Sequence, residues 1–221
     1  MGDPSQGGCT GSDPKAHRTC RRDKVRDAVV ARILDGRYPA GTHLKEMTLA
    51  KEFATSQSPV REALRELEML GLVETERYRG TRVLSPRCTD LREAYELKAI
   101  IESRSAQLAV PCRSEDLDHL DDCVRAMIAA AALADFEGYS VAAVAFHRRI
   151  VSMSGNQTFL RTWEGLHWEV RSRIASERVK SHLAGYADAH GAVAVALRQG
   201  AGLGAGGLLV AIIDRFLDEN G

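Results

Sequence analysis

Residues 58–71 constrain the fold of this 221-residue chain more than any other segment. They read SPVREALRELEMLG, in which apolar side chains recur at helical spacing and most other positions are charged. Ser58 is a favourable N-cap, Pro59 suits the first helical position, and Gly71 can end the helix. The segment therefore predicts a short amphipathic helix over 59–70, with one buried side and one side facing solvent.

The patterns on either side place this helix in a small mixed domain over residues 20–85. Before it, apolar residues at helical spacing predict a first helix that stops near Gly36, and Thr48 can cap a short second helix. After it, LVETERYRGTRVL reads as two short strands around a turn at Arg79 and Gly80. Helix, short helix, turn, helix and hairpin is the order of a winged helix-turn-helix.

Outside this domain the sequence predicts a tail and a helical bundle. Residues 1–19 are rich in Gly, Ser, Pro and Asp, which favours a flexible tail. Ser85 and Pro86 form the expected linker, and no strand pattern occurs after them. Helices are expected from residue 89 to Pro111, over 114–134, 137–154, 157–180 and 184–198, and finally up to Leu217. The predicted fold class is mostly α, with an N-terminal winged helix-turn-helix and a C-terminal all-helical bundle over 86–221.

The segment RQGAGLGAGGLL, just before the last predicted helix, is unusually rich in glycine. Gly200 and Gly202 suit a turn. Gly206 and Gly207 are expected to weaken the start of the helix by roughly 1 kcal/mol each, because glycine loses the most backbone freedom on ordering.

Charge and cysteine content exclude several classes of protein. Lys and Arg exceed Asp and Glu by 15 to 12 in residues 1–85 and fall short by 15 to 18 in residues 86–221. This weak asymmetry fits a DNA-binding head on an acidic body. The five cysteines form no CxxC pair, so neither a zinc ribbon nor a disulfide framework is indicated. With no stretch of eighteen apolar residues and no secretory signal, we expect a soluble cytoplasmic protein with no membrane partner.

Positive charge lies on the polar side of the predicted helix over 59–70. Arg61 and Arg65 are four residues apart and opposite the apolar stripe, where a recognition helix carries its base-reading side chains. An arginine can bind guanine O6 and N7, or a phosphate, in bidentate fashion. In the alternative interpretation these arginines are solvated surface charges, paired with Glu62, Glu66 and Glu68.

Residues beside this helix can add contacts to DNA. The stretch before it supplies small hydroxyls and backbone N–H groups that can reach phosphate, helped by the helix dipole. The predicted hairpin around Arg79 and Gly80 is the wing of this domain. At its tip, arginines flank Gly80 and can enter a minor groove. The candidate DNA-binding residues are Thr55, Ser56, Gln57, Ser58, Arg61, Arg65, Arg79, Gly80 and Arg82, with Arg77 as a further wing arginine.

These motifs resemble a known family. The stretch DGRYPAGTHLKEMTLAKEFATSQSPVREALRELEMLGLVETERYRGTRV closely resembles the N-terminal domain of GntR-type bacterial regulators, above all in SPVREAL and in LEMLGLV followed by a glycine wing. The helical part of the chain resembles the FadR-like branch, in which an all-helical bundle binds the ligand. The resemblance implies DNA contacts by Arg61 and Arg65, supported by Ser56, Ser58 and Gly80. Gln57 stands where relatives usually have arginine, and because glutamine can read adenine the operator is expected to differ from a guanine-bearing half-site.

The same resemblance implies an altered metal site in the helical part. AFHRRIVSMSGNQTFL resembles a helix in which a histidine and the aspartate four residues earlier bind a divalent metal. His147 matches the histidine, but Ala143 stands at the aspartate. DAHGAVAVAL resembles a later metal helix with His190 at the ligand position, and a further ligand falls at His167 or in the register of Trp168. Two or three imidazoles could hold Zn or Ni, with water or an effector carboxylate at the open positions.

A metal-free cavity is the alternative, in which the same histidines, with Arg148 or Arg171, bind an anionic effector. The leading hypothesis for the whole chain is a ligand-responsive repressor that binds a palindromic double-stranded operator as a homodimer and senses a small carboxylate metabolite. One rival is a metal-dependent hydrolytic enzyme, against which stands the lack of HExxH, GxSxG, Walker or GxGxxG motifs. A second rival is a non-sensing architectural DNA-binder, whose sign would be a purely apolar cavity.

Overall fold

The computed structural model describes residues 14–76, 79–84 and 88–219. The chain divides into two compact units, Met1–Pro86 and Arg87–Gly221, which we call the N-terminal and the C-terminal unit. The predictions for residues 1–13 of the tail, for Arg77 and for the linker at 85–86 lie outside the described residues. Within the described ranges, no helix is both long enough and apolar enough to cross a membrane.

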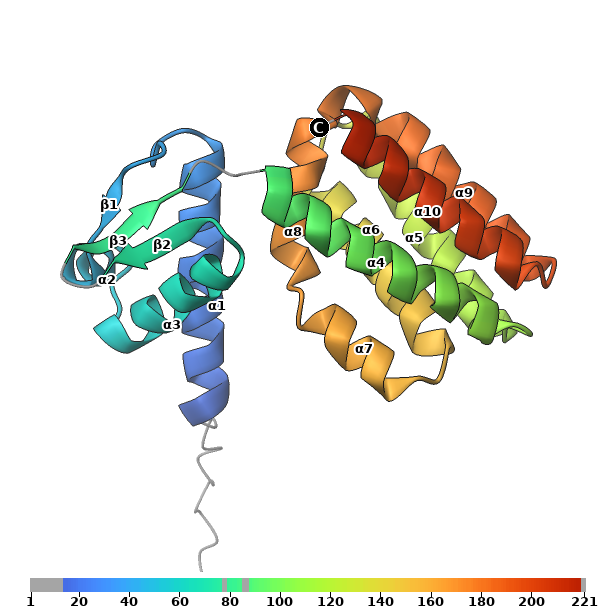
Figure 1. The fold of residues 1–221 in the computed structure, drawn as a ribbon, viewed down its shortest axis with the longest axis horizontal. Helices are drawn as coiled ribbons and strands as arrows, with labels where there is room; N and C mark the ends of the chain where they lie inside the picture. Colours follow the sequence, from blue (N-terminus) through green and yellow to red (C-terminus); the bar gives the residue numbers. More distant parts are fainter. Residues whose placement is uncertain (1–13, 77–78, 85–87, 220–221) are drawn as a thin grey trace, which may run out of the picture. The chain divides into compact units, whose positions relative to one another are not determined.

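The N-terminal unit consists of three helices and a small antiparallel sheet (Figure 1). In chain order the elements are α1 (Pro14–Leu34), β1 (His43–Leu44), α2 (Glu46–Glu52), α3 (Gln57–Met69), β2 (Val73–Glu76) and β3 (Gly80–Val83). Strand β3 lies between β1 and β2 and pairs antiparallel with both. This arrangement confirms the predicted winged helix-turn-helix.

Helix α3 is fixed in this unit by its apolar stripe. Val60, Leu64 and Leu67 are almost completely buried, as are Val29 and Val30 of α1, against which α3 packs. Full burial of an aliphatic side chain contributes about 1.5–3 kcal/mol. Because this side of α3 is held in the core, its opposite side faces outward.

The start of α3 differs from the prediction. The helix begins at Gln57 after Ser56, so Ser58 is not the N-cap and Pro59 lies in the third helical position. A proline is tolerated there because the first N–H groups of a helix have no partner within the helix. The N-cap prediction was therefore wrong by two residues.

Three other local predictions in this unit also need correction. Thr48 lies inside α2, which begins at Glu46, and does not cap it. Residues 14–19 of the predicted tail belong to α1. Strand β1 was not predicted, because two residues are too few to display the alternation of a strand.

All the regular secondary structure described in the C-terminal unit is helical. Its elements are α4 (Cys88–Ala109), α5 (Ser114–Ala132), α6 (Phe136–Met153), α7 (Gln157–Glu164), α8 (Trp168–Arg178), the 3-10 turn η1 (Lys180–His182), α9 (Leu183–Arg198) and α10 (Gly202–Glu219). Helix α4 packs against α10 and α6, and α5 packs against α6 and α9 (Figure 1). This confirms the predicted helical bundle.

The single helix predicted over 157–180 is interrupted. α7 ends at Glu164, and α8 begins at Trp168 after a turn in which His167 has a left-handed φ of 53°. Gly165 is the one glycine of this stretch and no proline marks the break, so the sequence gives little sign of it. The new helix start places the Trp168 side chain in the core, where it is 1% exposed.

The glycine-rich segment also differs from its prediction. Gly200 has a φ of +73° and forms the expected turn, but Gly202 already belongs to α10. A Cβ on Gly206 would lie 2.8 Å from the backbone oxygen of Ser103, and one on Gly202 would lie 2.8 Å from that of Ala106. These glycines allow α10 to lie close against α4, and this close packing offsets their low helix propensity.

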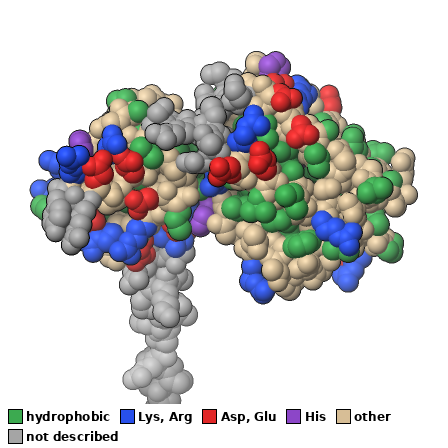
Figure 2. Space-filling model, viewed as in Figure 1, with side chains coloured by type: hydrophobic (Ala, Val, Ile, Leu, Met, Phe, Trp, Pro, Cys, Tyr) green, Lys and Arg blue, Asp and Glu red, His purple; other side chains and the backbone are tan. Residues whose placement is uncertain are grey.

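Large apolar side chains remain exposed on α4 and α10. Ile100 is 68% exposed and Leu203 is 76% exposed. Figure 2 shows hydrophobic side chains, in green, on the face of the C-terminal unit that α4 and α10 present in that view. The exposed set on these two helices, which we call the α4–α10 face, is Leu97, Ile100, Leu108, Leu203 and Leu208.

Candidate functional sites

The outward side of α3 carries both arginines that were predicted to read DNA. Arg61 and Arg65 are exposed. Arg61 forms a bidentate ion pair with Glu46 at the start of α2, with Nε 3.0 Å from Oε1 and Nη2 2.8 Å from Oε2. Its hydrogen bonds lower the pKa of the Glu46 carboxyl group. Among the described residues Arg65 has no ion-pair partner, so α3 presents one paired and one unpaired guanidinium.

Two glutamates of α3, Glu66 and Glu68, bind groups other than these arginines. Glu66 is buried and pairs with Arg22 at 3.0 Å and with Arg26 at 3.2 Å, both on α1. Glu68 accepts a hydrogen bond of 2.8 Å from the backbone N–H of Thr75, which ties α3 to the wing. For Glu66 and Glu68, the ion pairs expected in the alternative interpretation are therefore replaced by contacts that stabilise the domain.

The residues just before and at the start of α3 are accessible. Ser56, Gln57 and Ser58 are exposed, whereas Thr55 is half-buried and its hydroxyl has no hydrogen-bond partner. The Ser56 side chain makes no capping bond. The hydroxyls of Ser56 and Ser58 and the first N–H groups of α3 lie where the helix dipole favours a phosphate.

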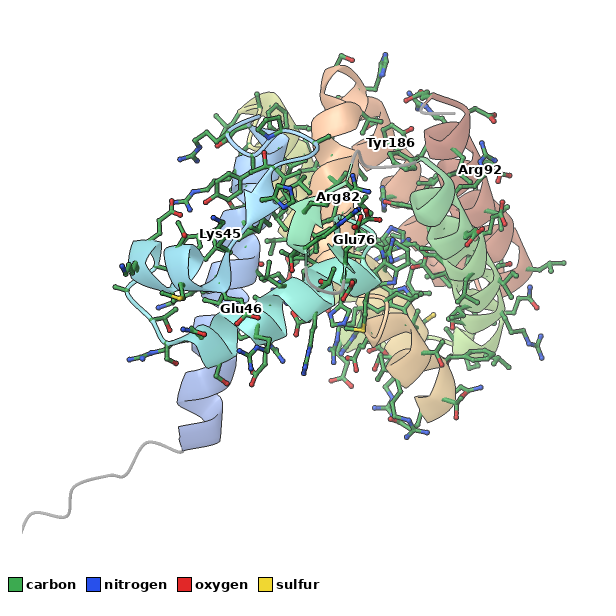
Figure 3. All side chains as sticks on the ribbon, turned by 60° about the vertical axis from the view of Figure 1, so that its left-hand side comes forward. Lys45, Glu46, Glu76, Arg82, Arg92 and Tyr186 are labelled. Carbon is green, nitrogen blue, oxygen red and sulfur yellow. The ribbon has the colours of Figure 1, made fainter. Side chains whose placement is uncertain are left out.

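The wing is a hairpin, and its described arginines pair with glutamates of the same hairpin. Arg82 on β3 pairs with Glu74, its cross-strand neighbour on β2. It also lies 3.4 Å from Glu76, and Figure 3 labels Arg82 and Glu76. Arg79 lies 3.1 Å from Glu76 and is largely exposed. Gly80 has a φ of +85°, which glycine adopts without strain, and it makes the tight turn possible.

A cavity of about 70 Å³ lies inside the C-terminal unit. A cavity of 10–15 Å³ already holds a water molecule, so this one has room for a small organic molecule. Its wall contains both tryptophans and three of the five tyrosines of the chain. The residues that line it are Tyr95, Lys98, Tyr139, Ala143, Val144, His147, Trp163, Trp168, Ser172, Ala175, Ser176, Val179, Tyr186, His190, Ile212, Ile213 and Phe216.

A chain of buried polar groups runs along one side of the cavity. Glu102, which is fully buried, accepts hydrogen bonds from Lys98 Nζ at 2.8 Å and from Trp163 Nε1 at 2.7 Å. His147 Nδ1 lies 2.8 Å from Glu102 Oε2, although the angle is poor for a hydrogen bond. His147 Nε2 lies 3.0 Å from His190 Nε2. The structure thus brings His147 and His190 together in one cavity, as the sequence predicted.

Burial controls the charges in this chain of groups. It lowers the pKa of Lys98, of His147 and, to about 3, that of His190. Burial alone would raise the pKa of Glu102, but His147 and Lys98 beside it outweigh burial and hold that pKa at about 2. Glu102 is therefore ionised at neutral pH and Lys98 compensates its charge. His190 Nδ1, 2.6 Å from the Tyr186 carbonyl oxygen, must be the donor, which leaves its Nε2 to face His147.

The donor set does not fit a resident metal ion. Zinc sites use three or four protein ligands, and of the side chains that the structure describes only the imidazoles of His147 and His190 converge here. At the two other positions that the resemblance suggested, Ala143 has a methyl group and Trp168 an indole N–H, and neither can ligate a metal. Within the described residues no group of three His, Cys, Asp or Glu could hold a metal ion. The Lys98 ammonium beside both imidazoles also opposes a second cation.

The other residues proposed from the sequence for this site lie elsewhere. His167 precedes α8 and is not among the lining residues, because the turn before α8 puts Trp168 into the cavity wall instead. Arg148 is exposed and pairs with Glu164 at 2.8 Å. Arg171 is buried and its Nε donates to the Leu166 carbonyl oxygen. None of these three lines the cavity.

Sequence reasoning missed Lys98 and Glu102. They are four residues apart on α4, on the side that also buries Ala94 and Ile101. A lysine and a glutamate at this spacing usually indicate a solvated helix surface. Their position within an apolar stripe was the signal that could have identified them as buried.

A three-helix domain with a wing and outward arginines on its third helix, joined to a unit with an internal cavity, defines a DNA-binding regulator. Residues 21–83 match the bacterial regulatory proteins of the gntR family, and residues 93–215 match the FCD domain. The chain belongs to the gntR family of bacterial regulatory proteins and carries an FCD domain as its C-terminal unit. Its relatives are transcriptional regulators, not enzymes.

Individual relatives agree with this assignment. The chain is 34% identical over 183 residues to a protein of Paenarthrobacter nicotinovorans named as a probable D-xylose utilization operon transcriptional repressor, covering 83% of this chain and 81% of that protein. It is 30% identical over 139 residues to the gluconate operon transcriptional repressor of Bacillus licheniformis, covering 61% and 56%. A GntR regulator from Rhodococcus sp. RHA1 has the same fold, with a TM-score of 0.68, 22% identity and coverage of 90% and 96%.

Proposed function

We propose that this protein is a ligand-responsive transcriptional repressor that binds a palindromic operator as a homodimer and senses a small carboxylate metabolite. The observation that carries the proposal is that one chain contains both a candidate DNA-binding surface and a candidate ligand cavity. The N-terminal unit presents Arg61 and Arg65 on an exposed recognition helix, and the C-terminal unit encloses a cavity with buried polar groups in its wall. Ligand would regulate DNA binding by binding the DNA-ready and the released states with different affinity.

Repression of sugar or sugar-acid genes is supported by the relatives, whose names refer to repressors of D-xylose and gluconate operons. A carboxylate effector is supported by the donors that line the cavity, Lys98 among them. The non-sensing alternative would call for a purely apolar cavity. The buried Lys98, His147 and His190 in this wall favour a sensing role.

Homodimerisation is supported by two features. A single recognition helix of about three turns offers too few base contacts for typical specific affinity, whereas two helices related by a dyad read two half-sites. The α4–α10 face leaves five large apolar side chains exposed, and a second copy of this chain would bury them. Sedimentation equilibrium measures this directly, and a monomer that binds DNA one-to-one would contradict the proposal.

Selection of double-stranded DNA from a random pool by the full-length protein tests the operator prediction. We expect an inverted repeat whose half-sites lie about one helical turn apart. Because Gln57 stands where relatives usually have arginine, we expect an adenine at one position of each half-site. Enrichment of no sequence at all would count against a specific regulator.

A further inference from the structure

Apart from His147 Nδ1, which lies 2.8 Å from Glu102 Oε2, two buried side-chain polar atoms of the described cavity wall have no hydrogen-bond partner within the protein. These atoms are the hydroxyl oxygen of Tyr139 and the indole Nε1 of Trp168. Both residues line the cavity, and they are 4% and 1% exposed. A buried donor without an acceptor is costly, and native proteins rarely keep one without a reason. The two atoms therefore point to a ligand that supplies the missing acceptors.

Lys98 adds a charged donor to the same wall. Its ammonium lies 2.8 Å from Glu102 Oε2 and 5.4 Å from the centre of the Trp168 ring. An ammonium has three N–H bonds, and of the described residues only Glu102 accepts from it. Glu102 has a further donor in Trp163 Nε1, so it does not depend on Lys98 alone. Two N–H bonds of Lys98 can thus serve a ligand while the buried ion pair stays intact.

The polar groups of the wall are mostly donors. Lys98 and Trp168 can only donate, and Tyr139 can donate through its hydroxyl. Among the side chains that the structure describes, no carboxylate lines the cavity, and Glu102 is not among the lining residues. A complementary ligand carries several acceptors on one small group, as a carboxylate does. The aromatic side chains around these donors suit the carbon skeleton of such a molecule.

We propose that the cavity binds a small carboxylate directly through Lys98, Tyr139 and Trp168, with no metal ion between the protein and the ligand. The proposal rests on the regulatory function proposed above and names the groups that recognise its effector. The imidazoles of His147 and His190, 3.0 Å apart, are held by each other and by their neighbours and do not need a metal to bring them together. Lys98 supplies the positive charge that a metal would otherwise supply.

Calorimetry on the full-length protein tests the ligand class and the role of metal together. The probes are D-xylonate, D-gluconate and glycerate, each matched with the neutral polyol of the same length, xylitol, sorbitol or glycerol. Every titration is run in EDTA and again with added Zn or Ni. We expect at least one carboxylate to bind at least about tenfold more tightly than its polyol, with the same Kd in EDTA and in metal.

Three results would overturn the proposal: binding that requires Zn or Ni, equal binding of carboxylates and polyols, or binding of no carboxylate in the set. Operator binding is measured on the same preparation. Intact operator binding without carboxylate binding rejects the inference and leaves the regulator standing. Loss of specific DNA binding rejects the proposed function itself.

Two conservative substitutions test the individual donors. Tyr139→Phe and Trp168→Phe each remove an unpartnered polar atom. Ligand-free Tyr139→Phe should melt at the same temperature or higher, whereas Trp168→Phe also leaves a space in the core and should melt lower. Each should nevertheless bind the carboxylate about tenfold more weakly. Tyr38→Phe, which removes a hydroxyl bonded to Arg32 and Glu52 in the N-terminal unit, is the matched control and should leave carboxylate binding unchanged. Unchanged binding in both cavity variants, or a lower melting temperature of Tyr139→Phe without weaker binding, would contradict the assignment.

Discussion

The two units of this regulator use charged side chains in opposite ways. On α3, Arg61 is 53% exposed and its partner Glu46 is 33% exposed. Beside the cavity, Lys98 is 6% exposed and Glu102 is fully buried. An exposed pair contributes at most about 1 kcal/mol because water and salt screen it, whereas removing one partner of a buried pair leaves an uncompensated charge. We therefore expect Arg61 to exchange its carboxylate partner for DNA, and we expect loss of either partner in the buried pair to destabilise the C-terminal unit.

The largest expected effect is on the buried side of this comparison. Glu102→Ala should lower the free energy of unfolding of the full-length protein by about 3–5 kcal/mol, because Lys98 would remain buried without a counter-charge. Urea denaturation followed by circular dichroism measures the change. Glu46→Ala, which breaks the exposed pair, is the matched control and should cost less than about 1 kcal/mol. Similar losses in the two variants would remove the distinction between the units.

The same carboxylate predicts a dependence of stability on pH. The pKa of Glu102 falls from an ordinary 4.5 to about 2 in the folded protein. A lowered carboxyl pKa stabilises the fold fully above the unfolded value, and this stability is lost as pH falls through the folded value. The melting temperature should therefore drop between pH 4.5 and pH 2, and Glu102→Gln should remove part of that drop. An identical pH profile in the variant would show that another group is responsible.

The next prediction concerns the C-terminal unit and tests the close packing of α10 on α4. Gly206→Ala should destabilise the protein by about 1–3 kcal/mol, because the new methyl group would lie 2.8 Å from the Ser103 backbone oxygen. Gly207→Ala is the control in the next position, where a Cβ has nothing within 4 Å. That change should stabilise α10 by up to about 1 kcal/mol through helix propensity alone. Thermal melts of both variants distinguish packing from propensity, since propensity would stabilise both.

On the exposed side, the expected effect is on DNA affinity and not on stability. Arg61→Ala should weaken operator binding by about 1–3 kcal/mol and relax the preference at one base pair per half-site. Fluorescence anisotropy at fixed salt measures both. Arg37→Ala is the control, because Arg37 is 64% exposed and pairs with Asp35 outside α2, α3 and the wing. If Arg61→Ala bound the operator with wild-type affinity and specificity, α3 would not recognise the operator bases through Arg61.

The sequence predicted the elements that show a strong local period. The amphipathic stripe of α3, the hairpin around Gly80 and the helical pattern beyond the linker all reappear in the structure. The resemblance of the motifs around His147 and His190 also led us to expect both side chains in one cavity, and both line it in the structure. Each of these features is encoded by a pattern of residues that lie close together in the sequence.

The features that the sequence did not reveal depend on contacts between distant segments. Whether His167 or Trp168 enters the cavity was decided by a turn that has little local signal. Lys98 looked like a surface residue until α4 was packed in the bundle. Gly206 was expected to weaken its helix, because helix propensity can be judged from the local sequence alone. Its packing partner Ser103 is about a hundred residues away in the chain, so their close approach could not be predicted. Local propensity gives way to tertiary packing in all three cases.

The smallest expected effect concerns Glu46, the carboxylate that Arg61 would exchange for DNA. Glu46→Gln keeps the shape of the side chain but removes its charge, so Arg61 loses a competitor and the DNA phosphates lose a repelling neighbour. Operator affinity should rise by about 0.3–1 kcal/mol at low salt, and the gain should shrink as salt screens the charges. Asp35→Asn, which breaks the exposed pair with Arg37, is the control and should leave affinity within error. Weaker binding by Glu46→Gln would mean that the carboxylate positions Arg61 for base reading, and the pair would then resemble the fixed cluster around Glu102 more than an exchangeable one.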